Sequence, residues 1–245
     1  MSGHSKWANI KRRKAAVDAK KGALYTKLGR EIIAAAREGG GNPDANFRLR
    51  LAIERAKAAN MPSDNIQRAI MKGTGELQEG AALEEITYEG YGPGGMAVMV
   101  QVMTDNRNRA TQEVRYIFSR HGGSLGEAGC VAWMFKKKGS IIVPREGNSM
   151  SEDDLLMLAL EAGAEDVRTD EEGFEVLTAP ADFQAVLEAL RKAEVNVAEA
   201  EVTMVPQNTV DLDGEQAEKA LALLEALEDC EDVQNVYANL EDAAG

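Results

Sequence analysis

The 245-residue sequence has no stretch near the roughly 18 consecutive apolar residues that a membrane-spanning helix requires. Its first residues also lack the apolar core of a secretory signal. These two absences argue against membrane-spanning and secreted proteins. We therefore expect a cytoplasmic protein that has no membrane partner.

Cysteine and histidine are scarce, with two residues of each. Cys130 and Cys230 are too few for a disulfide framework and lack the close pairing of a zinc site, so we expect small buried residues. His4 and His121 belong to no metalloprotease or cysteine-protease motif, and neither a G-x-S-x-G nor a Walker A motif occurs. We therefore predict no catalytic site, metal, cofactor or small-molecule substrate. Folding can still bring distant carboxylates together, so an enzyme stays open as the less favoured alternative.

The net charge of −13 hides a segregation of charge along the chain. Residues 1–72 contain 16 lysines and arginines and 6 aspartates and glutamates, a net charge of +10. The other residues contain 12 basic and 35 acidic ones, a net charge of −23. One end of the chain therefore attracts phosphate, whereas the rest repels it.

Residues 1–78 show the hydrophobic period of helices. Four apolar residues recur every fourth position between residues 22 and 37, and a run of three glycines ends this first helix. The same period predicts a second helix capped by Asp44 and a third capped by Ser63 or Asp64. We therefore expect an all-helical N-terminal domain.

Residues 136–205 read as a complete α/β module. Their pattern predicts a strand, a helix, two strands, a helix and a strand, which is the βαββαβ order of ferredoxin-like folds. The flanking segments, 79–135 and 206–245, each supply half of another such module. The expected elements of the two halves are a short strand at 85–89, strand 96–103, helix 106–121 and strand 131–135, then strand 209–212, helix 215–229 and strand 233–239.

Joining the two halves gives a second ferredoxin-like domain, into which residues 136–205 are inserted. The predicted fold class is therefore α+β, with a helical N-terminal domain followed by two ferredoxin-like βαββαβ domains, one inserted into the other. One continuous α/β sheet is the alternative.

Closely spaced cations near the N-terminus predict a phosphate-binding stripe. No acidic residue precedes Asp18, and cations that neutralise phosphates release condensed counterions. Trp7 offers a ring on which a base can stack, and His4 and Ser5 can donate hydrogen bonds to phosphate or sugar. The alternative is a solvated helix surface with a buried Trp7. The predicted nucleic-acid-binding residues are His4, Ser5, Lys6, Trp7, Lys11, Arg12, Arg13 and Lys14, supported by Lys20, Lys21, Lys27 and Arg30.

Two further segments have polar or glycine-rich patterns. Residues 90–95 match the dinucleotide pattern GxGxxG, but a strand is expected after them, whereas the fingerprint needs a helix there. We therefore interpret them as a turn between strands. Residues 104–109 lie between a strand and a helix, where they can cap the helix or contact a partner, and capping is the favoured role.

Five separated motifs together resemble the YebC family over the full length of the chain. They are Met1–Lys11 (MSGHSKWANIK), Met61–Ile66 (MPSDNI), Tyr88–Gly95 (YEGYGPGG), Thr104–Arg109 (TDNRNR) and Val131–Phe135 (VAWMF). The resemblance implies three domains, one helical and two α/β, with one α/β domain interrupting the other. It also implies a probable transcriptional regulator that binds DNA. Similarity to the mitochondrial members, translational activators of cytochrome c oxidase, implies instead a ribosome-associated factor that assists difficult sequences such as proline runs.

The residues themselves favour a non-enzymatic regulator of gene expression whose partner is DNA or ribosomal or transfer RNA. No helix-turn-helix with a reading helix rich in Arg, Asn and Gln is evident, which weakens sequence-specific DNA readout. Acidic modules can rest against basic ribosomal proteins, which favours RNA and the ribosome as partners. A protein-interaction scaffold, in which the ferredoxin-like sheets bind a partner, is the competing class.

Overall fold

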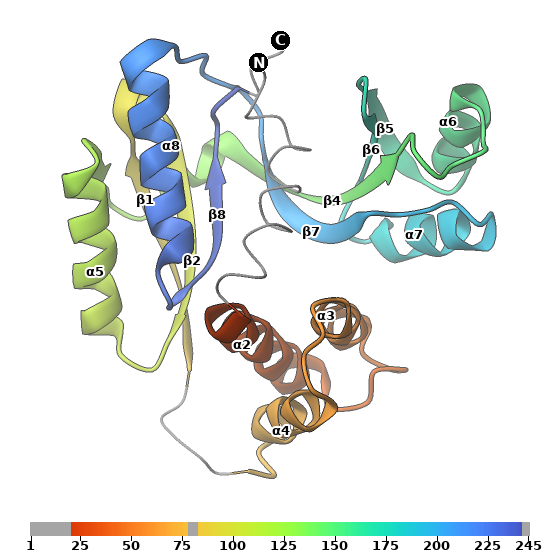
Figure 1. Cartoon of the computed structure of the whole chain (residues 1–245), viewed down its shortest axis with the longest axis horizontal. Coiled ribbons are helices and arrows are strands. Elements are labelled where there is room, and N and C mark those ends of the chain that lie inside the picture. The colour runs from red at the N-terminus through yellow and green to blue at the C-terminus, as the bar shows by residue number, and fades with distance from the viewer. Residues whose placement is uncertain (1–20, 78–82, 242–245) are drawn as a thin grey trace. The chain divides into compact units, whose positions relative to one another are not determined.

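The computed structural model describes residues 21–77 and 83–241 (Figure 1). A helical N-terminal region precedes two four-stranded antiparallel sheets, which confirms the predicted α+β class. Met134–Gln207 form one compact unit, and the described residues on both sides of them form the other. The predicted insertion of one α/β module into another is therefore also confirmed.

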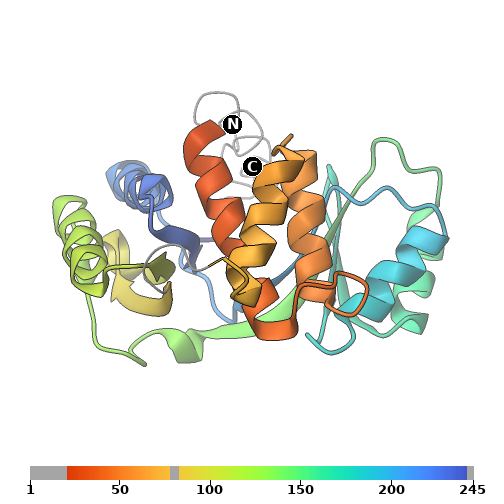
Figure 2. The same cartoon turned by 90° about the horizontal axis from the view of Figure 1, so that it is seen from below.

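The described part of the N-terminal region contains the helices α2 (Lys21–Gly39), α3 (Phe47–Ala58) and α4 (Ser63–Thr74). Figures 1 and 2 show them as a small bundle, and Ile32, Leu49 and Ile66 are buried in its core. A Cβ atom at Gly73 would lie 2.6 Å from both the Cβ of Ala36 and the carbonyl oxygen of Ile33. Glycine at this position therefore allows α4 to approach α2 closely.

The predicted caps of α3 and α4 are wrong by one or two residues. Asn46, rather than Asp44, caps α3, and its Oδ1 accepts a hydrogen bond from the Leu49 amide at 3.1 Å. Its Nδ2 donates to the carbonyl oxygens of Ala35 and Gly40. An asparagine side chain can accept and donate at once, whereas an aspartate carboxylate only accepts, which explains why Asn46 can both cap α3 and bond these two carbonyl groups. Helix α4 begins at Ser63 itself, after Pro62, without a side-chain cap.

The first sheet belongs to the larger unit and has the order β3-β1-β2-β8. Its strands are β1 (Glu84–Tyr91), β2 (Ala97–Thr104), β3 (Ser124–Leu125) and β8 (Val233–Ala238). Helices α5 (Arg107–Arg120) and α8 (Gly214–Asp229) share its core, in which Val98, Val100, Phe118, Leu223 and Leu227 are buried. Every residue of β2 except Gln101 is buried, as expected for a central strand.

Two predicted strands of this sheet are wrong, although its other predicted strands and both of its helices are present. Ala132–Met134 form a 3-10 turn instead of a strand, because the amides of Val131 and Ala132 bond a buried carboxylate rather than a neighbouring strand. Residues 209–212 make a single bridge, Val210 to Leu240. Strand β1, which includes the short strand predicted at 85–89, pairs with β2 along eight residues.

The second sheet lies within Met134–Gln207 and has the order β5-β6-β4-β7. Its elements are β4 (Phe135–Pro144), α6 (Glu152–Glu161), β5 (Ala164–Thr169), β6 (Gly173–Thr178), α7 (Phe183–Lys192) and β7 (Glu199–Pro206). This is the βαββαβ order predicted from the sequence. A Cβ atom at Gly139 would lie 2.6 Å from a ring carbon of Phe183, so glycine brings α7 close to β4.

Candidate nucleic-acid interface

Most of the predicted phosphate-binding stripe lies outside the described residues. This applies to His4, Ser5, Lys6, Trp7, Lys11, Arg12, Arg13, Lys14 and Lys20. Lys21 begins helix α2. Of the predicted nucleic-acid-binding residues, Lys27 and Arg30 have described side chains, and both lie on α2.

Lys27 and Arg30 contact the end of helix α8 and the loop that follows it. The Nζ of Lys27 donates to the carbonyl oxygen of Glu228, which suits the negative end of a helix dipole. Burial lowers the pKa of Lys27, although nearby Cys230, Glu228 and Asp229 partly oppose this effect. Arg30 donates to the carbonyl oxygen of Glu231 at 2.6 Å. These two cations therefore hold α2 to the α/β part of the same unit.

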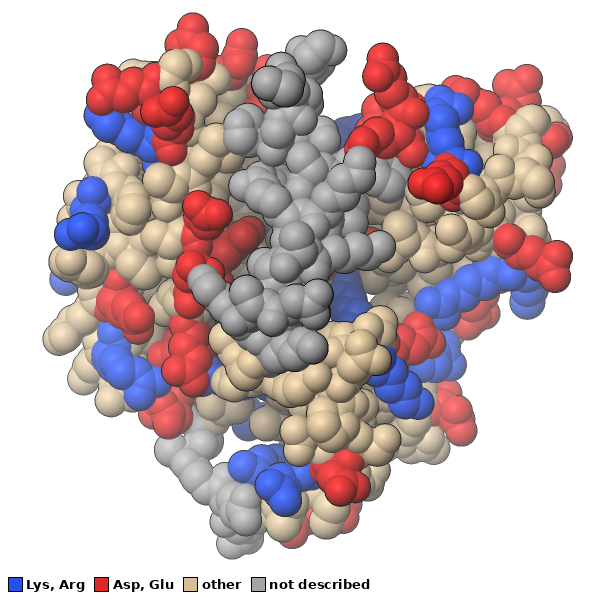
Figure 3. All heavy atoms as spheres, viewed as in Figure 1, with Lys and Arg blue, Asp and Glu red and all other residues tan. Residues whose placement is uncertain are grey.

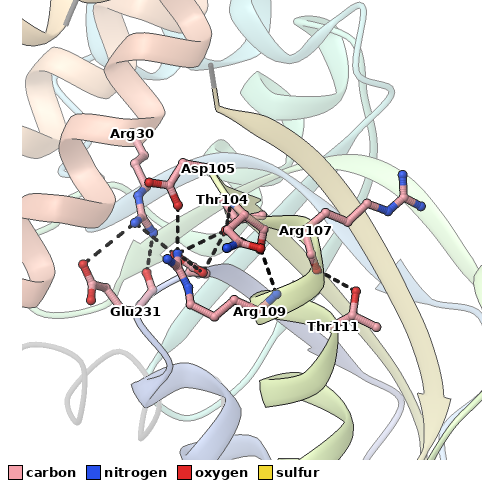
Figure 4. Close-up of polar contacts among 9 residues, drawn as sticks. Arg30, Thr104, Asp105, Arg107, Arg109, Thr111 and Glu231 are labelled. Atoms are coloured by element: carbon pink, nitrogen blue, oxygen red, sulfur yellow. Dashed lines mark hydrogen bonds and ion pairs between the residues drawn. The ribbon is translucent and has the colours of Figure 1, made fainter. Parts of the chain in front are cut away.

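Figure 4 shows Arg30, Thr104 and Arg109 meeting at this contact, and the ion pairs of both arginines place Asp232 at its centre. Its side chain is 3% exposed and pairs with Arg30 at 3.1 Å and with Arg109 at 2.8 Å. The hydroxyl of Thr104 donates a third contact at 2.9 Å. Burial alone would raise the pKa of Asp232, but the hydrogen bonds from Arg109 and Thr104 outweigh it and lower the pKa. One buried carboxylate thus joins an arginine of α2 to an arginine of α5.

Residues 104–109 cap helix α5, as predicted. The Oδ1 of Asn106 accepts from the Arg109 amide at 3.1 Å, and the Thr104 hydroxyl accepts from the Asn106 amide at 3.0 Å. The guanidinium of Arg109 also pairs with Asp105 at 2.9 Å. The partnership with Asp232 was missed, because no local pattern connects residues 123 positions apart.

The glycine-rich turn joins two strands, as predicted for residues 90–95. A 3-10 turn at Pro93–Gly95 links β1 to β2, so no helix N-terminus faces it. Gly94 has a φ of 67°, and a Cβ atom there would lie 2.3 Å from the side chain of Leu212. The arrangement that binds a dinucleotide pyrophosphate is therefore not built here.

A second buried carboxylate, Glu89 on β1, organises the loop that ends the first half of the unit. Its oxygens accept hydrogen bonds from the amides of Gly129, Val131 and Ala132 at 2.7, 2.8 and 2.7 Å. Burial raises the pKa of Glu89, but the three amides overcome that effect, and the net pKa is lowered. Two of the five family motifs, at 88–95 and 131–135, therefore meet through Glu89.

The loop that Glu89 holds carries an aromatic residue on its surface. Trp133 is 64% exposed, and its indole nitrogen donates to the carbonyl oxygen of Cys130 at 3.1 Å. The hydroxyl of Tyr91 donates to the same oxygen at 3.0 Å. Cys230 is buried as predicted, whereas Cys130 is only partly buried.

The motif at Met61–Ile66 has a structural role in the helical bundle. Asn60, just before it, has a left-handed φ of 59°, and its carbonyl oxygen accepts from the hydroxyl of Tyr25 at 2.8 Å. Met61 and Ile66 are both buried in the bundle core. This corner therefore fixes α3 and α4 against α2.

Within residues 21–77 and 83–241, no three His, Cys, Asp or Glu side chains are grouped as metal ligands. No helix in those ranges has the length and apolar character needed to cross a membrane.

Comparison with known proteins identifies relatives over almost the whole chain. The model of the TACO1/YebC protein N-terminal domain matches residues 5–76, and that of the TACO1/YebC second and third domain matches residues 83–240. A probable transcriptional regulatory protein of Pelotomaculum thermopropionicum is 61% identical over 98% of this chain and 99% of its own. One from Dictyoglomus turgidum is 59% identical over 98% and 96%.

A solved structure supports the same relationship. The crystal structure of a conserved hypothetical protein from Aquifex aeolicus is 53% identical and has a TM-score of 0.83. The similarity covers 93% of each chain.

Proposed function

Because this chain belongs to the TACO1/YebC family, whose relatives compared above are named probable transcriptional regulatory proteins, we propose a non-enzymatic regulator of gene expression that binds nucleic acid. Binding occurs through the basic N-terminal domain, in the cytoplasm. The names of the relatives favour DNA as the polyanion and transcription as the regulated process. The working domain boundaries are 1–78 for the basic domain, 79–135 with 206–245 for the split domain, and 136–205 for the inserted domain.

The segregation of charge is the observation that carries this proposal. Residues 1–72 have a net charge of +10, and the rest of the chain has −23. Arg48 pairs with Glu31 and Glu38 within the bundle, and Lys27 and Arg30 contact the α8 end. These contacts use part of the positive charge of the described helices. The cations of residues 1–20 are therefore the main candidates for contact with phosphate.

Charge reversal tests this proposal in the intact protein. In the variant Arg12→Glu/Arg13→Glu/Lys14→Glu, we expect affinity for a fluorescent 20-nucleotide strand at low salt to fall ten-fold or more, because phosphate contacts dominate such binding. The matched control Arg168→Glu/Lys192→Glu/Lys219→Glu makes the same change of net charge on the acidic domains. Unchanged affinity in the first variant, or an equal loss in both, would contradict the proposal.

A ribosome-associated translation factor is the second candidate. The inserted unit, Met134–Gln207, contains 16 acidic and 7 basic residues. Such a surface repels free nucleic acid but attracts basic ribosomal proteins. In this version the N-terminal domain contacts ribosomal or transfer RNA, while the acidic domains contact protein.

Crosslinking in cells separates the two candidates. The bound nucleic acid is sequenced after crosslinking and purification of the intact protein. Enrichment of promoter DNA supports the transcriptional role, whereas enrichment of ribosomal or transfer RNA supports the translational one. If neither kind of nucleic acid is enriched, the result contradicts both candidates and favours the protein-interaction scaffold.

A further inference from the structure

The basic residues of the split α/β domain are concentrated on one helix. Residues 83–133 and 208–241 contain 16 acidic and only five basic residues, and four of these five are arginines of α5. The neighbouring helix α8 carries five acidic residues and one lysine. The two helices lie side by side over the same sheet (Figure 1). Figure 3 accordingly shows blue side chains along α5, at the left margin, and a column of red ones along α8.

Three of the four arginines on α5 are exposed and have no carboxylate partner in the part of the chain that the structure describes. Arg109 pairs with Asp105 and Asp232. Within the described residues, Arg107, Arg115 and Arg120 are exposed and make no ion pair. Figure 4 shows the guanidinium of Arg107 pointing away from the cluster around Arg109. Their charge is therefore available to an external anion.

The position of Arg107 opposes the stability of its own helix. It is the first residue of α5, and the first turn contains no acidic residue. A cation at a helix N-terminus interacts unfavourably with the helix dipole. Asp105 and Asp232 pair with Arg109 and offset its repulsion by the helix dipole, but they do not pair with Arg107. An anionic ligand would relieve the repulsion.

An aromatic ring is exposed on the same helix. Tyr116 is 61% exposed, whereas the inward-facing residues Ala110, Val114 and Phe118 are buried. Its hydroxyl accepts a contact of 3.4 Å from Arg120, and Arg115 precedes it in the chain. A ring accompanied by arginines is the combination that binds single-stranded nucleic acid, because bases stack on the ring while the cations neutralise phosphates. An acidic peptide would bind to the cations without using the ring, so the exposed ring favours nucleic acid as the ligand.

We propose that the exposed side of α5 is a second nucleic-acid contact, which binds a single strand. Arg107, Arg115 and Arg120 neutralise its phosphates, and a base stacks on Tyr116. Between Arg107 and Arg120 the helix rises about 20 Å, and at about 100° per residue Arg115 lies about 80° around the axis from Arg107 and Arg120 about 140° further round, so a strand that contacts all three spans several nucleotides and crosses the exposed surface obliquely. The acidic helix α8 repels the strand and confines it to α5. This inference rests on the proposed function and adds a site outside the N-terminal domain.

The test compares two triple variants of the intact protein by fluorescence anisotropy, using 20-nucleotide single strands of RNA and of DNA. Arg107→Gln/Arg115→Gln/Arg120→Gln removes the proposed contacts. Arg168→Gln/Lys192→Gln/Lys219→Gln removes the same charge from other exposed positions. We expect the α5 variant to bind roughly ten-fold more weakly at low salt, with a log-log salt slope shallower by about 2, because each phosphate contact on a single strand contributes about 0.7. The control variant keeps the slope of the unmodified protein.

Tyr116 is tested separately, because stacking requires the ring rather than the charge. Tyr116→Ala is expected to weaken single-strand binding about five-fold or more and to leave duplex binding unchanged, while Tyr116→Phe retains affinity. Arg107→Gln should not lower the thermal midpoint, because it removes a cation from a helix N-terminus. A loss of binding in that variant therefore does not reflect unfolding.

The outcomes separate this inference from the proposed function. If the α5 and control variants bind equally well, or if Tyr116→Ala binds as the unmodified protein does, the α5 site is wrong. The proposed function then still stands, provided that reversal at Arg12, Arg13 and Lys14 weakens binding. If the unmodified protein binds neither RNA nor DNA at low salt, both are wrong.

Discussion

Glu89 and Asp232 are two buried carboxylates with unlike partners. Glu89 is satisfied by three backbone amides of one loop, and Asp232 by two arginines and a threonine. A buried charge is tolerated only when its hydrogen bonds are complete, so loss of either carboxylate leaves donors unsatisfied. We therefore expect both carboxylates to stabilise the fold by satisfying buried hydrogen-bond donors.

Glu89→Gln is expected to destabilise the protein by about 2–4 kcal/mol. The amide side chain keeps one acceptor oxygen but turns an NH₂ group toward backbone donors, and buried unsatisfied donors cost about 1–3 kcal/mol each. The free energy of unfolding is measured in urea. Glu127→Gln, an exposed change in the same loop, is the control and should stay within about 0.5 kcal/mol of the original protein. Equal stability of the two variants would refute this role of Glu89.

The lowered pKa values of Glu89 and Asp232 predict weaker stability in acid. Because the folded-state pKa of each lies below its unfolded value, the stabilisation is complete above about pH 5 and is lost as the pH falls through the unfolded and then the folded value. The stability difference between the original protein and Glu89→Gln should therefore shrink between pH 7 and pH 3. Urea unfolding at several pH values measures it, and a constant difference would contradict the assignment.

At the level of elements, Asp232 holds helix α2 against the start of α5. Arg30 of α2 and Arg109 of α5 both pair with it (Figure 4). Glu231, the preceding residue, lies 3.8 Å from Arg30, but its side chain is 71% exposed. Arg30 therefore lies near one buried carboxylate, that of Asp232, and one exposed carboxylate, that of Glu231.

Asp232→Ala is expected to expose α2 and the first turn of α5 to solvent more often, since the two guanidinium groups then lose the buried carboxylate that joins them. Hydrogen exchange followed by mass spectrometry should show protection in peptides of both helices reduced about ten-fold, with Met134–Gln207 unaffected. Glu231→Ala, the control, should leave protection unchanged, because exposed pairs contribute little. Equal effects of the two variants would contradict the role of Asp232.

The sequence predicted elements well where the pattern is local. Helix α5 follows from the spacing of Ala110, Val114 and Phe118, and the inserted module follows from a complete βαββαβ order. Strand 131–135 was wrong because its apolar residues read as a strand, while their amides bond the distant Glu89. Residues 209–212 were predicted as a strand but make a single bridge, because the pairing partners of a segment depend on distant segments and not on its own pattern.

The candidate site was predictable only in part for the same reason. Clustered cations near the N-terminus are visible as sequence, but the contacts of Lys27 and Arg30 with the α8 end join residues 201 positions apart. The sequence also did not predict the site on α5, because it does not show that the arginines of α5 lie beside the acidic helix α8.

For the whole molecule, a negative net charge and affinity for a polyanion are compatible because the charges are segregated. Cations gather in the N-terminal region and, within the split α/β domain, on α5, while Met134–Gln207 is strongly acidic. The account therefore predicts that a bound strand contacts only certain parts of the chain.

Photocrosslinking of the intact protein to a 4-thiouridine-containing RNA strand, or a 4-thiothymidine-containing DNA strand, tests this prediction most directly. After tryptic digestion, mass spectrometry locates the crosslinked peptides. The account predicts adducts within residues 1–30 and on α5. Adducts concentrated within Met134–Gln207 would contradict it.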